Sequence, residues 1–68
     1  MNTLHFKKVN DDHFQRVLVS PSNEVLYTGT AERSSSNMET LFKDYVAQMK
    51  TIPGMDITKV TNEYGFSL

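Results

Sequence analysis

The sequence predicts a small α+β fold: a three-stranded antiparallel β-meander, one amphipathic helix packed on one face of the sheet, and a C-terminal β-strand, in the order βββαβ. Three observations predict it: β-rich runs separated by short turns in the first half, a helical stripe of apolar residues in the second, and a β-branched run after that stripe. With 68 residues, of which 38% are hydrophobic, the chain can build one small core. We therefore expect a single domain over residues 1–68.

The meander is predicted from three runs: Leu4–Val9, His13–Ser20 and Glu24–Thr28. The turn between the first two is Asn10–Asp12, and Asn and Asp favour turns because their side chains bond to the local backbone. The turn before the third run is Pro21–Asn23, where proline presets φ and asparagine tolerates the left-handed conformation.

The helix is predicted from a capping box and an apolar stripe. Ser36 is the expected N-cap, with Glu39 three residues later bonding back to it. Apolar residues then recur at helical spacing: Met38, Leu41, Phe42, Tyr45, Val46 and Met49. The segment 52–54, Ile-Pro-Gly, ends the helix. This stripe is typical of a helix packed on a sheet, and a partner-binding helix is the alternative.

The tail is predicted to add a strand over Asp56–Thr61, which is rich in β-branched residues. Residues 62–65, Asn-Glu-Tyr-Gly, suggest a turn, after which residues 66–68 either pair again or fray.

Strand alternation predicts two apolar sheet faces. With three-residue loops at both turns, Leu4 lies opposite Leu18, and Leu18 lies opposite Leu26. One face then gathers Leu4, Phe6, Phe14, Leu18 and Leu26. The other gathers Val9, Val17, Val19, Val25 and Tyr27, together with His5 and His13. One helix covers one face only. Either the C-terminal segment, or the twist of the sheet and its loops, covers the second face, or that face or an edge meets another protein or a second copy of the chain.

Catalytic and metal-binding patterns are scarce, so we expect no enzyme and no cofactor. The chain has no cysteine, which excludes disulfides and thiolate metal sites, and it has no nucleophile or phosphate-loop motif. His5 and His13 could approach each other across the first hairpin, with Asp11 or Asp12 nearby, and form a small metal site. No spacing motif supports that site, and we expect no metal.

The run from Phe6 to Met49 resembles the YegP-like family of small bacterial proteins. The residues that carry the resemblance are segments 12–18 (DHFQRVL) and 22–26 (SNEVL), followed by the Ser-rich loop into the helix. The resemblance implies a three-stranded meander followed by a helix. It implies no particular activity. This turn is usually Asn-Gly-Glu in the family. In this chain it is Ser22-Asn23-Glu24, without the glycine.

The function expected from these features is that of a protein-binding module: a small regulator or inhibitor, of the kind that phages encode, which occludes a partner protein. The expected partner-binding residues are Val17, Val19, Val25 and Tyr27, and a homodimer through the same surface is also expected. A membrane-spanning or secretory segment is not evident, so the expected location is the cytoplasm.

The alternative function is a nucleic-acid-binding accessory protein that uses the sheet face. The net charge of −1 argues against it. It gains support if the fold gathers the basic residues on one face: Lys7, Lys8, Arg16, Arg33 and Lys59.

Overall fold

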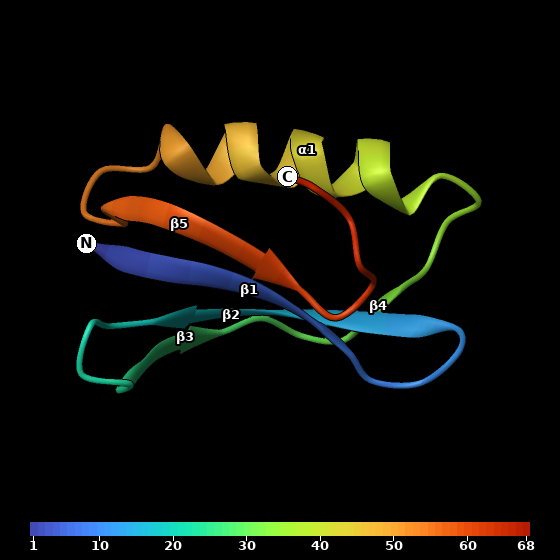
Figure 1. The fold of residues 1–68 in the computed structure, drawn as a ribbon, viewed down its shortest axis with the longest axis horizontal. Helices are drawn as coiled ribbons and strands as arrows, with labels where there is room; N and C mark the ends of the chain where they lie inside the picture. Colours follow the sequence, from blue (N-terminus) through green and yellow to red (C-terminus); the bar gives the residue numbers. More distant parts are fainter.

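The computed structural model describes all 68 residues and consists of one sheet with one helix lying across it (Figure 1). The strands are β1 (Asn2–Lys8), β2 (His13–Val19), β3 (Val25–Thr28), β4 (Glu32–Arg33) and β5 (Ile57–Asn62), and the helix is α1 (Met38–Lys50). At 13 residues, α1 is too short to cross a lipid bilayer. The structure confirms the predicted α+β class, the meander, the helix and the C-terminal strand.

The sheet differs from the predicted one in two respects. Its strand order is β3-β2-β1-β5, and β5 pairs with β1 in parallel, so the sheet is mixed. A short strand, β4, also pairs with β2, just before the Ser-rich loop that leads into the helix. Between β3 and β4 the chain stays bonded to β2, because the Gly29 amide donates to the Arg16 carbonyl at 2.8 Å. The Gln15 side chain in turn donates to the Gly29 carbonyl at 2.8 Å. Therefore β3 and β4 together form one edge of the sheet.

The register of the first hairpin is as predicted, with Leu4 opposite Leu18. The predicted register of the second hairpin, between β2 and β3, is wrong by one residue beyond the first pair after the turn. Val19 pairs with Val25, but a bulge follows, and Leu18 pairs with Tyr27 rather than Leu26. A bulge inserts one extra residue in a strand, and here that residue is Leu26.

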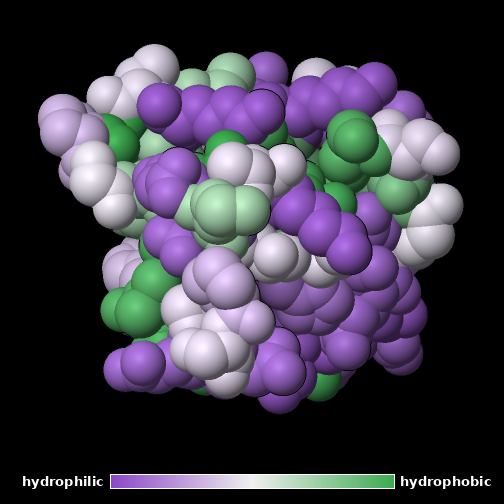
Figure 2. All heavy atoms as spheres, turned by 60° about the vertical axis from the view of Figure 1, so that its left-hand side comes forward, coloured by the Kyte–Doolittle hydropathy of each residue, from purple (hydrophilic) through white to green (hydrophobic).

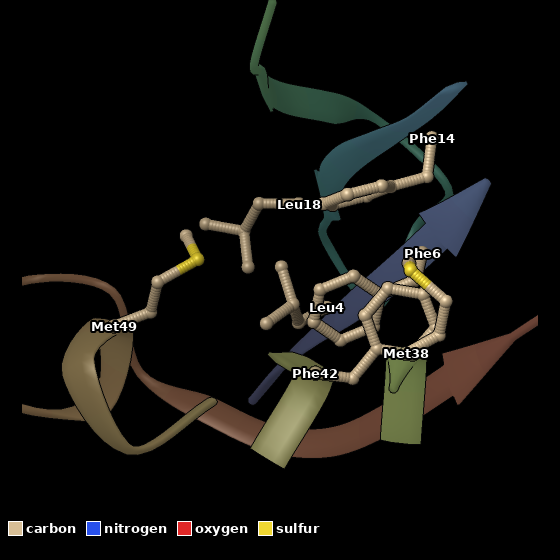
Figure 3. Packing of buried hydrophobic residues seen from close by; sticks show 7 residues of the cluster. All are labelled: Leu4, Phe6, Phe14, Leu18, Met38, Phe42 and Met49. Carbon is tan, nitrogen blue, oxygen red and sulfur yellow. The ribbon is translucent and has the colours of Figure 1, made fainter. Parts of the chain in front are cut away.

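The core lies between α1 and the sheet (Figure 3). It contains seven buried side chains: Leu4, Phe6, Phe14, Leu18, Met38, Phe42 and Met49. Phe42 stacks on Phe6 with ring centroids 4.2 Å apart and meets Phe14 edge-on at 5.3 Å. Offset and edge-on pairs of this kind are the geometries that aromatic rings prefer. Leu26, which we expected on this face, is exposed because of the bulge.

The N-cap of the helix lies one residue later than predicted. Asn37 is the N-cap, and its Oδ1 accepts from the Thr40 amide at 3.2 Å. The predicted capping box of Ser36 and Glu39 is therefore wrong. Asparagine caps a helix as well as serine does, and Glu39 instead pairs with Lys43 at 3.2 Å, one turn along the helix.

The C-terminal tail folds back toward α1 (Figure 1). The predicted turn forms at Asn62, whose Oδ1 accepts from the amides of Tyr64 and Phe66. Gly65 takes a positive φ of 82° there. The rings of Tyr64 and Phe66 then pack edge-on against Phe42. The tail thus forms no further strand and covers the helix side of the sheet, so it leaves the opposite face open.

Candidate functional site

The face of the sheet that points away from α1 is covered by no other part of the chain. Strand residues alternate between the two faces, and directly paired residues share a face. Leu4, Phe6, Phe14 and Leu18 face α1. The strand positions that alternate with these four therefore face away, and so do the residues paired with those alternate positions. We call this set the open face: Thr3, His5, Lys7, His13, Gln15, Val17, Val19, Val25, Thr28, Arg33, Lys59 and Thr61.

Three valines form the apolar part of the open face. Val19 pairs with Val25, and Val17 lies two residues before Val19 on β2. Val17 and Val19 are half-buried within the sheet, and Val25 is 59% exposed at the edge. The structure therefore brings together three of the four residues that we expected to bind a partner.

Tyr27, the fourth, lies elsewhere. It pairs with Leu18 and so shares the side of the sheet that faces α1. The cause is the bulge at Leu26, because one extra residue moves every following side chain to the other face. Val9, which we also placed on this face, lies beyond the end of β1.

Strand β3 adds an unpaired edge to the open face. All four of its residues are exposed, including Leu26 at 48% and Tyr27 at 37%. No strand pairs with its outer side, and none of its residues is charged. Figure 2 shows apolar residues in the lower part of the molecule, where Figure 1 places β2 and β3, beside a broad hydrophilic area. An exposed edge strand can pair with another chain, and proteins often protect such strands with charges, which β3 lacks, or with bulges, of which β3 has one at Leu26.

The charges of the open face are positive. Lys7, Arg33 and Lys59 lie on it, and none of them makes an ion pair within the chain. No aspartate or glutamate occupies a strand position on this face. The carboxylate of Glu63, just after β5, lies close to this face, with its Oε2 3.9 Å from Nε2 of His5. Of the five basic residues that the sequence offered for one face, these three share it, Arg33 through β4, whereas Lys8 and Arg16 lie on the helix side.

The two histidines do not meet. His5 lies opposite Val17, and its Nδ1 bonds to the Thr61 hydroxyl at 2.6 Å. His13 lies opposite Arg33, and its Nδ1 contacts the Asn10 side chain at 3.2 Å. The approach of His5 to His13 that we considered is thus absent, and no three His, Asp or Glu side chains are grouped closely enough to hold a metal ion.

On the helix side, Arg16, Glu32 and Tyr45 form a polar cluster at the margin of the core. The Tyr45 hydroxyl donates to Glu32 Oε1 at 2.6 Å, and Arg16 Nε lies 3.2 Å from Glu32 Oε2. The Arg16 guanidinium also lies over the Tyr45 ring, 4.3 Å from its centroid. The hydrogen bond to Glu32, and then burial, raise the pKa of Tyr45. Arg16 and Glu32 are each other's charged partners, and their contacts with Tyr45 connect β2 and β4 to α1.

Comparisons with family models, with curated proteins and with solved structures give no match. The resemblance to the YegP-like family therefore stays a prediction.

Proposed function

We propose that this chain is a non-enzymatic protein-binding module of the cytoplasm, a small regulator or inhibitor that occludes a surface of its partner. One observation carries the proposal: an uncovered sheet face with three valines continues into an unpaired, uncharged edge strand. The phage origin that we expected is part of the same proposal.

Both the backbone and the side chains of this surface favour the binding of another protein. The outer edge of β3 offers free N–H and C=O groups, so an extended segment of a partner can add to the sheet as a further strand. The side chains of that segment would then lie beside Val25, and the rest of the partner would reach Val17 and Val19. Burying these apolar groups contributes roughly 25 cal/mol per Å².

Nucleic-acid binding is the second candidate, and the placement of Lys7, Arg33 and Lys59 on one face favours it. Sheets that bind single-stranded nucleic acid also present aromatic side chains on which bases stack. Here Phe6 and Phe14 are fully buried under α1, and Tyr27 lies on the helix side. Lys8 pairs with Phe14 and Arg16 with Phe6, which puts both on the helix side as well. A protein partner is therefore the better candidate.

The experiment compares two variants that make the same chemical change at similar exposure. Val25→Lys places a charge on the β3 edge, where Val25 is 59% exposed, and Ile52→Lys places one after α1, where Ile52 is 46% exposed. Proteins captured from a nuclease-treated lysate by the wild-type chain are identified, purified and titrated against all three forms by calorimetry.

We expect Val25→Lys to weaken the purified partner's binding by about tenfold, since the lysine replaces an apolar contact and its charge loses water where the apolar side chains of the partner lie. Ile52→Lys should leave the affinity unchanged. Equal affinities for both variants, or capture that nuclease abolishes, would contradict the proposal.

A further inference from the structure

We propose that the open face selects an acidic partner: an extended protein segment that carries apolar side chains flanked by carboxylates. This inference rests on the proposed function and adds the chemistry of the partner. It starts from the distribution of unpaired charge over the molecule.

Three of the four basic side chains without an ion pair lie on the open face, and the fourth, Lys50, lies on α1. Of the basic side chains on strands, the three without an ion pair, Lys7, Arg33 and Lys59, all lie on the open face. No carboxylate without an ion pair occupies a strand position: Asp12 directly precedes β2, Glu24 directly precedes β3, and Asp44 lies on α1, as does Lys50. Because the whole chain carries a net charge of −1, the molecule outside the open face is negative.

The cations surround the valines rather than mixing with them. One cross-strand row of the open face runs Lys59, Thr3, Val19, Val25. Neighbouring strands are about 4.8 Å apart, so Lys59 lies roughly 10 Å from Val19 across that row. Lys7 and Arg33 lie toward the other end of the strands, beyond Val17. A ligand that covers the valines therefore meets positive charge on more than one side.

This arrangement favours a different protein over a second copy. Two open faces packed against each other would bring six unpaired cations into one interface, and no strand position of that face carries a carboxylate. Like charges brought together in an interface oppose the association of the two surfaces. A segment with carboxylates on either side of apolar residues matches the face without that repulsion.

The test uses four fluorescein-labelled probes of similar length: a peptide that alternates glutamate and valine, a matched lysine–valine peptide, polyglutamate, and oligothymidine. Binding to the full chain is measured by fluorescence anisotropy at low and high salt. The open-face variant is Lys7→Gln with Lys59→Gln. Its matched control removes the same charge from α1 by Lys43→Gln with Lys50→Gln.

We expect the glutamate–valine peptide to bind at least about tenfold more tightly than the lysine–valine peptide, and more tightly than polyglutamate, which lacks the apolar part. The open-face variant should weaken this binding about three- to tenfold, because exposed ion pairs each contribute modestly. The helix control should not change it, and high salt should weaken it.

Equal binding of the two valine peptides, an equal loss in the helix control, or no binding of the glutamate–valine peptide would overturn the inference. None of these three outcomes tests the proposed function, which is decided separately by comparing the partner affinities of Val25→Lys and Ile52→Lys. Tighter binding of oligothymidine than of the glutamate–valine peptide would overturn both, since the open face would then serve a nucleic acid.

Discussion

At the scale of single residues, the fold depends on a few large side chains. Phe6, Phe14 and Phe42 are fully buried and contact one another across the interface of sheet and helix. Phe42 also contacts the tail through Tyr64 and Phe66. One side chain thus connects α1, both central strands and the C-terminal segment.

Phe42→Ala should therefore unfold the domain or nearly so. The cost of truncating a buried phenylalanine is about 3–5 kcal/mol, which is a large part of the stability that a chain of this size has. Urea unfolding followed by circular dichroism measures it. Ile52→Ala, at an exposed position, is the control and should change stability by less than about 0.5 kcal/mol. Unfolding curves that coincide for Phe42→Ala and the wild type would show that the stripe of α1 is not core.

The hydrogen bond from Tyr45 to Glu32 gives a prediction about pH. Because the pKa of Tyr45 is raised in the folded chain, and an unfolded tyrosine ionises near pH 10, the neutral phenol favours the folded state. This contribution is fully present below about pH 10 and is lost as the pH rises through the folded pKa. The Tyr45→Phe variant lacks this pH-dependent contribution. At neutral pH its free energy of unfolding should be about 1 kcal/mol lower than that of the wild type, because Glu32 loses a hydrogen-bond donor.

The measurement is urea unfolding of both forms between about pH 8 and pH 11. The wild type should lose more stability across this range than Tyr45→Phe. The two other tyrosines, Tyr27 and Tyr64, are present in both proteins and cancel in the comparison. Parallel curves would show that the Tyr45 hydroxyl is not coupled to folding.

At the scale of elements, the start of α1 distinguishes two neighbouring polar residues. Asn37→Ala should cost about 1 kcal/mol, since its side chain accepts from the Thr40 amide. Ser36→Ala should cost almost nothing, although serine is the residue that the sequence pattern favours as the cap. Thermal unfolding of the two single variants separates these outcomes, and a larger loss for Ser36→Ala would place the cap where the sequence pattern predicts it.

The elements that could be predicted from the sequence are those that depend on residues close together in the chain. The stripe of α1 and the first hairpin depend on spacing within a few residues, and both were predicted correctly. The bulge at Leu26 has no local marker such as a glycine, so the predicted sheet face of Tyr27 was wrong. Strand β4 has two polar residues that pair only because β2 continues beyond β3. Whether β5 runs parallel to β1 depends on the path of the whole chain.

The candidate site was predictable to the same extent. Val17, Val19 and Val25 follow from alternation within strands and from the register next to the turn. The positive charge of the open face required knowledge of two pairings distant in sequence, Thr3 with Lys59 and His13 with Arg33. Charge that is scattered along the chain is therefore gathered by topology, which a single sequence does not reveal.

At the scale of the whole molecule, the chain has one covered and one uncovered sheet face, with opposite consequences. The covered face supplies the core, and the tail reinforces it through Phe66. The open face carries valines with unpaired cations around them. Apolar contact favours association through this face, while its charge decides which surfaces can approach.

The homodimer that the sequence suggested is therefore expected to be weak when it uses the open face. Repulsion between Lys7, Arg33 and Lys59 of two copies opposes it at low salt, and added salt screens this repulsion because the screening length falls to about 10 Å near 0.1 M. Sedimentation velocity at several salt concentrations should show a monomer at low salt, with any association increasing as salt is added. Neutralising the face by Lys7→Gln with Lys59→Gln should also increase association, whereas Lys43→Gln with Lys50→Gln on α1 should not. A stable dimer at low salt that Val25→Lys dissociates would show instead that a second copy occupies the β3 edge, where no charge opposes pairing.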